Sequence, residues 1–292
     1  MSIIEEIKQS FREGTVLTKL IYFNIGVFLF LHAIIAILYL SSAQDNIMKV
    51  VSWMAVPADL QILLTRPWTI LTYMFLHKDF FHILFNVLWL YWFGKIFLSY
   101  FGEKRLSNIY LLGGFAGALL YIVSYNIFPV FNDQIPESMA LGASAAVMAI
   151  VIATSAYAPN HTVYLVFVGP VKIVWIAVIS FILSSIVDFS VNTGGKIAHI
   201  GGALFGYFFA IQYRHGRDIT TWFSKIMDYL FSLFQRRNKM KVTYKRAVDD
   251  FGYNAQKKAK QQEIDIILDK ISQKGYDSLT KEEKEKLFRM SR

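Results

Sequence analysis

The chain has 292 residues, of which 55% are hydrophobic and only 17% are charged, and its formal net charge is +9. A soluble domain of this length does not need so large an apolar share, so the composition predicts an integral membrane protein. Because the sequence contains no cysteine, disulfides and thiolate metal sites are excluded.

Six apolar runs are long enough to cross a hydrocarbon layer of about 30 Å at about 1.5 Å per residue. They lie at residues 17–40, 81–101, 106–128, 139–158, 171–189 and 197–213. We therefore predict an all-α polytopic membrane protein with six transmembrane helices. Residues 41–80 contain apolar stretches that are unsuited to free solution, and Pro57, Asp59, Arg66 and Pro67 interrupt these stretches. We expect this first loop to lie in the outer membrane interface.

The charged residues orient the predicted spans. Lys8, Arg12 and Lys19 precede the first span, and Lys95, Lys104 and Arg105 surround the loop after the second, whereas the loop at 129–138 contains no Lys or Arg. From residue 214 onward, 19 Lys and Arg stand against 11 Asp and Glu. Since Lys and Arg of short loops stay on the cytoplasmic side, both termini should be cytoplasmic. The basic tail then lies beside membrane lipids, and no nucleic-acid partner is expected, because no recognition motif accompanies the charge.

Four parts follow one another in the predicted organisation. They are a cytoplasmic segment at 1–16, a membrane domain at 17–213, a basic cytoplasmic linker at 214–262 and a small helical hairpin at 263–292. In the hairpin, Gly275 is a helix stop, and Thr280 lies three residues before Glu283 as a capping box. Two short helices bury little by themselves, so the hairpin should dock on the membrane domain, a second copy or another protein.

Polar side chains at membrane depth are costly, so spans that carry several of them are candidates for function. The second span opens with His82 and Asn86, whose i, i+4 spacing places them on one helix face. The fourth opens with Ser144 among small residues, and the sixth opens with His199. These three spans run in the same direction in the predicted topology, so all four side chains should lie at a similar depth toward the outer side.

Acyl transfer is the chemistry that would use these four residues. Ser144 needs a base to become a nucleophile, and the His199 imidazole is the candidate base. His82, Asn86 and the backbone N–H of Ser144 could stabilise the oxyanion of a tetrahedral intermediate. Small residues around Ser144, together with Gly202 and Gly206 in a GxxxG pattern, would let the fourth and sixth helices approach closely.

Three signature segments resemble those of the rhomboid intramembrane serine proteases. They are "HKDFFHILFNVLWLYWFG" from His77, "GASAAV" from Gly142 and "AHIGGALFG" from Ala198, in the family's order and on the second, fourth and sixth spans. The resemblance covers roughly residues 17–213. It implies a six-helix bundle in which Ser144 and His199 form the dyad, His82 and Asn86 line the oxyanion hole, and Gly202 and Gly206 pack the last helix.

The resemblance also implies the partners and the location. The substrates would be single-pass transmembrane proteins that are cut in or near their membrane-spanning segments, and no cofactor or metal is expected. The tail is similar to those of some bacterial rhomboids, so the expected location is a bacterial cytoplasmic (inner) membrane. Substrate identity and oligomeric state stay open.

Two positions depart from the family's pattern. The family often has glycine after the nucleophile, whereas this chain has Ala145, whose methyl group is expected near the oxyanion hole. Some bacterial members have an aromatic residue one turn after the serine, stacked on the catalytic histidine. Met148 stands at that position here, and its thioether could contact the ring edge.

Other polar residues have simpler interpretations. Asn24 and His32 in the first span match no signature and are expected to pack as polar residues. A metal site built from His77, His82 and His199 would lack any carboxylate, so it is disfavoured. Asp188 is expected to be an exposed terminus of the fifth span and not a third member of the dyad.

Three functions compete at this point. The first is an intramembrane serine endopeptidase. The second is a catalytically inactive rhomboid-like protein that binds membrane clients and aids their quality control, against which the retained Ser144 and His199 argue. The third is a transporter, which would spread its polar residues across the bilayer, whereas these cluster at one predicted depth.

Overall fold

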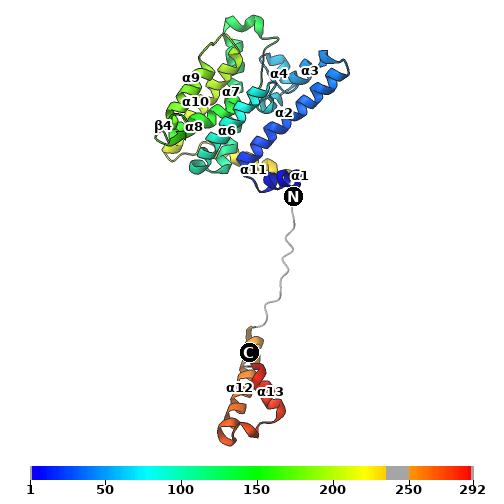
Figure 1. The fold of residues 1–292 in the computed structure, drawn as a ribbon, viewed down its shortest axis with the longest axis vertical. Coiled ribbons are helices and arrows are strands. Elements are labelled where there is room, and N and C mark those ends of the chain that lie inside the picture. Colours follow the sequence, from blue (N-terminus) through cyan, green and yellow to red (C-terminus); the bar gives the residue numbers. More distant parts are fainter. Residues whose placement is uncertain (1, 235–249, 291–292) are drawn as a thin grey trace. The chain divides into compact units, whose positions relative to one another are not determined.

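The computed structural model describes residues 2–234 and 250–290. The chain forms two compact units, residues 1–234 and 235–292 (Figure 1). The helices of the first unit are α1 (Ile3–Glu13), α2 (Val16–Leu40), α3 (Ile47–Ser52), α4 (Leu60–Thr65), α5 (Thr69–Thr72), α6 (Phe80–Phe101), α7 (Glu103–Ile127), α8 (Ser144–Tyr157), α9 (Ile173–Ser185), α10 (Thr193–Arg214) and α11 (Thr221–Phe234). Short 3₁₀ turns lie at Gln44–Asn46, Tyr73–Phe75 and Pro129–Gln134.

Each of the six predicted spans contains a helix, but the helices differ in length. Among the described residues, α2, α6 and α7 are long and apolar enough to cross a membrane. The apolar helices α8 and α9 have only 14 and 13 residues. At about 1.5 Å per residue, α8 is about 21 Å long, which is less than the thickness of a hydrocarbon core.

Helix α7 occupies the centre of the bundle and α2 its edge. Within the most apolar window of each helix, 61% of the α7 residues are buried but only 11% of the α2 residues. Helices α7, α8 and α10 pack directly against one another. A methyl group added at Gly113 of α7 would overlap the side chain of Ala149, and one added at Gly202 of α10 would overlap the carbonyl of Ala145. The glycines therefore allow three helices to approach to backbone contact.

Ring contacts show which helix ends lie together. Tyr157 at the end of α8 lies 4.7 Å from Phe101 at the end of α6 and 5.6 Å from Tyr213 near the end of α10, measured between ring centroids. The Val16 N–H at the start of α2 donates to Glu103 at the start of α7, at 3.0 Å. We call this the tail end of the unit, because the chain leaves it after α10. The starts of α6, α8 and α10 lie at the opposite end.

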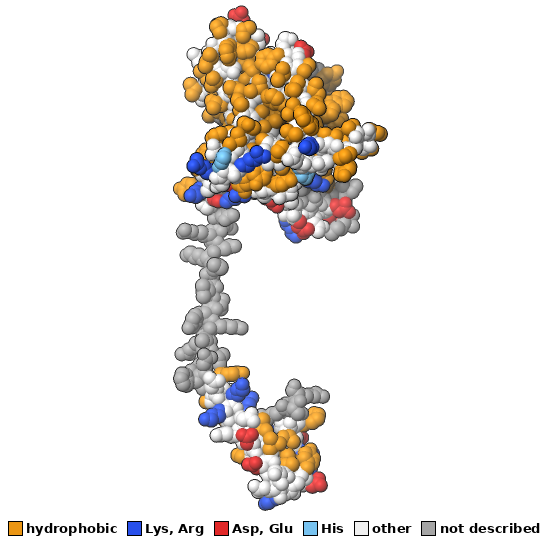
Figure 2. Space-filling view, turned by 90° about the vertical axis from the view of Figure 1, so that its left-hand side faces the viewer, with side chains coloured by type: hydrophobic (Ala, Val, Ile, Leu, Met, Phe, Trp, Pro, Cys, Tyr) orange, Lys and Arg blue, Asp and Glu red, His pale blue; other side chains and the backbone are white. Residues whose placement is uncertain are grey.

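Charge is distributed unevenly between the ends. Figure 2 shows Lys and Arg side chains gathered at the lower end of this unit, whereas hydrophobic side chains cover most of the surface above them. Such a surface is expected of a protein whose sides face lipid.

Two small antiparallel sheets correct the all-α prediction. β1 (Val56–Pro57) pairs with β2 (Met139–Ala140), and β3 (Thr162–Leu165) pairs with β4 (Gly169–Lys172). The first sheet brings the loop after α2 to the segment that precedes Ser144. Val56 and Ala140 are buried, and buried backbone groups of nonhelical segments need hydrogen-bond partners, which the pairing supplies.

The first loop folds into short helices that expose apolar side chains. The Trp68 Nε1–H donates to the Trp53 carbonyl at 2.9 Å, and the Arg66 guanidinium lies 5.0 Å from the centre of the Trp53 ring. Trp53, Trp68 and Leu64 are nevertheless exposed. Exposed tryptophans beside a cation are typical of segments at a membrane surface.

The tail differs from its predicted division. Residues 214–262 were expected to form a linker, but they contain α11 and the first half of α12 (Asp250–Lys274). Residues 235–249 of the predicted linker lie outside the described residues. Helix α11 has regularly spaced apolar residues, whereas the first half of α12 is mostly polar.

The second unit contains a helical hairpin, as predicted for its last part. Helix α12 ends before Gly275, which has φ +77°, and α13 (Lys281–Met290) follows a short 3₁₀ turn at Tyr276–Ser278. The Thr280 N–H donates to Glu283 at 2.8 Å, and the Glu283 N–H donates to the Thr280 hydroxyl at 3.4 Å. The capping box is thereby confirmed.

Asp218 fixes the turn between α10 and α11. Its carboxylate accepts hydrogen bonds from the Thr220 N–H and hydroxyl, at 2.9 and 2.7 Å, and pairs with Arg105 at 2.7 Å. Burial raises the pKa of this carboxyl, but the bonds from Thr220 and Arg105 outweigh burial and hold the pKa below its ordinary value of 3.8.

The substitution Asp218→Asn is expected to lower the stability of the protein. It should also make that stability change less as the pH falls into the acid range. Because the folded-state pKa is depressed, the carboxylate stabilises the fold above its unfolded-state pKa, and this contribution disappears as the pH falls through the folded-state value. Thermal unfolding of both proteins in one detergent, from about pH 7 down to about pH 3, checks this. The difference in Tm should narrow toward the acid limit, and a constant difference would contradict the assignment.

Candidate active site

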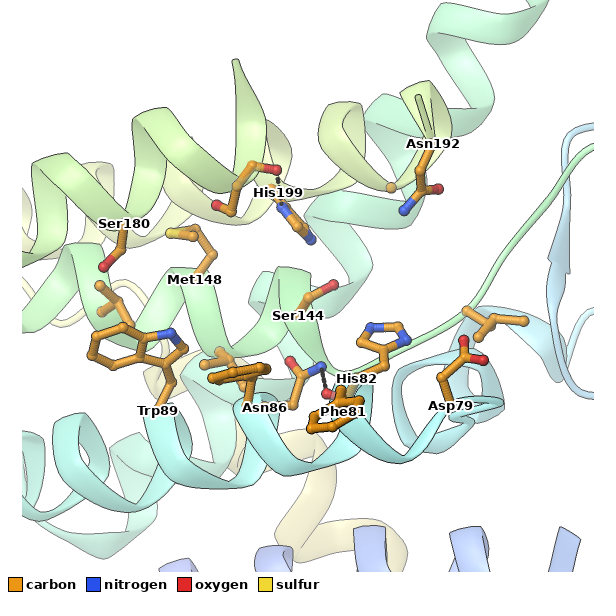
Figure 3. Close-up of a pocket in the computed structure, with 16 residues that line it drawn as sticks. Asp79, Phe81, His82, Asn86, Trp89, Ser144, Met148, Ser180, Asn192 and His199 are labelled. Atoms are coloured by element: carbon orange, nitrogen blue, oxygen red, sulfur yellow. Dashed lines mark hydrogen bonds between the residues drawn. The ribbon is translucent and has the colours of Figure 1, made fainter. Parts of the chain in front are cut away.

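A cavity of about 480 Å³ opens at the end of the bundle where α6, α8 and α10 begin (Figure 3). It collects residues that are far apart in the sequence, and all four polar residues predicted to act together line it. These are His82, Asn86, Ser144 and His199. The structure therefore brings these four side chains to one cavity.

Ser144 is the first residue of α8, and the turn before it is tightly determined. Gly142 has φ +120°, a conformation that residues with a side chain rarely adopt. A Cβ at Gly142 would lie 2.7 Å from the His82 ring. The Gly142 N–H donates to the Tyr73 carbonyl at 2.8 Å. Glycine at this position thus lets the chain pass His82 and direct Ser144 into the cavity.

His199 is held by a backbone carbonyl of the neighbouring helix. Its Nδ1 lies 3.1 Å from the carbonyl oxygen of Ser184, near the end of α9. Because a carbonyl only accepts, Nδ1 carries the proton in the neutral ring, and Nε2 keeps its lone pair. Figure 3 shows Ser144 pointing its hydroxyl toward the His199 ring.

The described residues contain no hydrogen bond between Ser144 and His199. Such bonds are often long or absent in unliganded active sites and tighten when substrate binds. Ser144 and His199 therefore lie on facing walls of one cavity. Among the described residues, no other side chain forms a hydrogen bond with the Ser144 hydroxyl.

His82 and Asn86 occupy successive turns of α6 and face Ser144 from the opposite wall (Figure 3). One amide hydrogen of Asn86 is committed, since Nδ2 donates to the His82 carbonyl at 2.8 Å. An amide group has a second N–H, which remains to serve a ligand.

His77 contributes to the site in a way that sequence reasoning missed. It is completely buried. Its Nε2 accepts the N–H of Ala143 at 3.2 Å, and its Nδ1 lies 3.2 Å from the Phe75 carbonyl. Both ring nitrogens therefore bind backbone groups, which leaves none for a metal. His77 instead ties the first loop to the residue directly before Ser144.

Ala145 and Met148, which depart from the family pattern, differ in whether they line the cavity. Ala145 does not line the cavity; its methyl group faces α7, because a Cβ at Gly117 would lie 2.5 Å from it. The expectation of a methyl near the oxyanion hole is therefore wrong. Met148 does line the cavity, on the same helix as Ser144 (Figure 3).

Asn24 is packed and Asp188 is exposed, both as predicted. Asn24 donates to the Leu20 carbonyl at 2.8 Å and to the Tyr110 hydroxyl at 3.0 Å. Asp188 accepts the hydroxyl of Ser190 at 3.1 Å. The bond from His199 goes to the Ser184 carbonyl and not to Asp188, so the described residues offer no carboxylate partner for this histidine.

Comparison with known proteins identifies the fold family. Residues 64–215 match the family model of the rhomboid domain. The chain belongs to the rhomboid family. All residues that line the cavity lie within the rhomboid domain. The match to this domain and the long apolar helices together indicate a membrane protein. Residues 247–292 match a second model, a family of unknown function (DUF6576), which covers the helical hairpin.

Two curated relatives come from Arabidopsis thaliana. "RHOMBOID-like protein 12, mitochondrial" is 31% identical over 162 residues, which cover 52% of this chain and 48% of that protein. "RHOMBOID-like protein 6, mitochondrial" is 28% identical over 144 residues, which cover 48% and 41%. The aligned region spans about half the length of either relative.

Proposed function

We propose that this rhomboid is an intramembrane serine endopeptidase with a Ser144–His199 dyad. The observation that carries the proposal is the common cavity, into which Ser144 points toward a histidine whose Nδ1 is tied to the Ser184 carbonyl. That bond selects the tautomer in which Nε2 can take a proton from the serine.

The reaction follows from the placement of these groups. His199 Nε2 removes the hydroxyl proton as Ser144 Oγ attacks the scissile carbonyl, and a tetrahedral oxyanion forms. The free amide hydrogen of Asn86, the His82 ring and the N–H of Ser144, which the helix does not use, stabilise that charge. His199 then gives its proton to the leaving amine. Water, activated by the same nitrogen, releases the acyl group from Ser144.

The proposed membrane placement uses all six helices as spans, with the tail end in the cytoplasm and the first loop in the outer interface. The basic residues at the tail end favour this orientation. Because α8 is short, Ser144 lies below the outer surface, and the cavity admits the water that hydrolysis needs. A bacterial cytoplasmic membrane stays a prediction, and both relatives carry the word mitochondrial in their names.

We place the substrate between α6 and α9, because both helices line the cavity. Phe81 and Phe85 on α6 and Ser180 on α9 lie on its walls, and both phenylalanines are exposed. A transmembrane segment could enter there from the lipid. It would need a locally weak helix, since a fully bonded helix hides its carbonyls from attack.

Labelling by a fluorophosphonate probe tests the proposal without a known substrate. The purified wild type should be labelled, whereas Ser144→Ala and His199→Ala should not be, because the probe reacts only with an activated serine. His32→Ala is the matched control, since His32 lies in α2 and bonds to the Phe28 carbonyl of its own helix. Labelling of folded Ser144→Ala would disprove the mechanism. An unlabelled, folded wild type would favour the client-binding alternative.

A further inference from the structure

Helix α11, at the tail end, presents three different faces around its axis. At 100° per residue, Phe223, Met227 and Ser224 lie on one arc and are at least partly buried. Lys225, Asp228 and Ser232 lie on a second, polar arc. A third arc is apolar and exposed, and its side chains are Trp222, Ile226, Tyr229, Leu230 and Leu233. We call this third arc the α11 stripe.

Helix α11 is fixed against the first half of α7. The Asn108 amide donates to the Ser224 hydroxyl at 2.6 Å and to the Thr220 hydroxyl at 3.2 Å. Asp228 of the polar arc pairs with Lys104 at 2.6 Å, and the ring centroids of Phe223 and Phe115 lie 6.3 Å apart. With these contacts on one side, the helix cannot turn its stripe into its own bundle.

Two other elements expose apolar side chains at the same end. Helix α1 directs Ile4, Ile7 and Phe11 outward, and the Ser10 side chain of α1 bonds to Tyr22 of α2 at 3.1 Å. The β3–β4 hairpin follows the end of α8, and the Phe167 side chain at its tip is 98% exposed. Three segments that are distant in sequence therefore present apolar groups next to the lipid-facing sides of the bundle.

The charges beside the stripe favour an anionic surface. Asp218 and Asp228 are paired with Arg105 and Lys104. Among the described residues, Lys225 has no carboxylate within ion-pair distance, and it lies next to the stripe. An amphipathic helix with tryptophan and tyrosine on its apolar face and a lysine at its margin is suited to lie in the plane of a membrane surface.

We propose that the α11 stripe is buried in the cytoplasmic leaflet, at the boundary between lipid headgroups and acyl chains. The occupant is the lipid surface itself, continuous with the lipid around α2, α6 and α9. Helix α11 thereby anchors the start of α7 and marks where the chain leaves the membrane toward its second unit. The proposal does not depend on catalysis by Ser144.

Single-cysteine labelling tests the proposal directly, because the full chain contains no native cysteine. Ile226→Cys lies on the stripe, and its neighbour Lys225→Cys lies on the polar arc. Each is labelled with an environment-sensitive nitrobenzoxadiazole dye and placed in vesicles of phosphatidylcholine with a minority of phosphatidylglycerol. Quenching is then measured with a lipid that carries a nitroxide near its headgroup, and with aqueous iodide.

The dye at position 226 should emit at shorter wavelength and be quenched several-fold more by the nitroxide lipid than the dye at 225, with the reverse order for iodide. Equal quenching by iodide at both positions would overturn the proposal. Protection of position 226 from both quenchers would also overturn it, because protein would then cover the stripe. Leu233→Cys with Ser232→Cys repeats the comparison if Ile226→Cys does not fold.

Discussion

Ser144→Ala is expected to reduce turnover of a transmembrane substrate on the order of 10⁶-fold, to the residual background that substrate binding and the oxyanion residues still support. His199→Ala should reach the same background, and the double variant should lose no more than either single variant. The reason is that the nucleophile and its base act in one step, so removing either removes the whole contribution. Time courses of substrate cleavage by purified protein in vesicles measure this.

The oxyanion residues should behave differently from the dyad. His82→Ala leaves Ser144 and His199 in place and removes one donor, so kcat should fall by about 10²- to 10³-fold while KM changes little. His32→Ala serves again as the control, with wild-type turnover. A His82→Ala variant that is as inactive as Ser144→Ala, yet labelled by a fluorophosphonate, would contradict this division of roles.

The sequence predicted the helices of the bundle because their apolar runs are long and their polar interruptions few. It also predicted that Ser144 and His199 form a nucleophile–base pair, because serine, histidine and glycine are conspicuous in an apolar helix. The bond from His199 to Ser184 could not be predicted in the same way. Its acceptor is a backbone carbonyl, which every residue has, so no residue type marks the position.

His77 and Ala145 show a related limit. A buried histidine can bind a metal, a side chain or the backbone, and only the positions of Phe75 and Ala143 decide among these. The methyl group of Ala145 could face the cavity or α7, and the rotation of α8 in the bundle decides. That rotation is set by Gly117 and Gly202 on two other helices.

Helix α11 was missed for a different reason. Trp222, Ile226, Tyr229 and Leu233 recur at the helical spacing, so the signal was present. The net charge and mean composition of residues 214–262 indicate a basic linker, because averaging over the segment hides the apolar positions of α11. An amphipathic helix is recognised by the spacing of its apolar residues and not by its mean composition.

Gly202→Val is expected to have the largest effect on stability. A side chain at this position would overlap the carbonyl of Ala145, which belongs to the backbone of α8 and cannot turn away. The helices α8 and α10 would have to separate, at a cost of roughly 3 kcal/mol. Gly26→Val is the matched control, because Gly26 lies in α2 with no atom within 4 Å of an added Cβ. Thermal unfolding in one detergent should show a large fall in Tm for the first variant and little change for the second.

The same substitution connects packing with catalysis. Ala145 follows Ser144 directly, so any shift of α8 away from α10 moves the nucleophile away from His199. Below its lowered Tm, folded Gly202→Val should therefore also lose fluorophosphonate labelling, whereas Gly26→Val should keep it. If Gly202→Val had wild-type stability and labelling, the close approach of these two helices would not be what holds the dyad together.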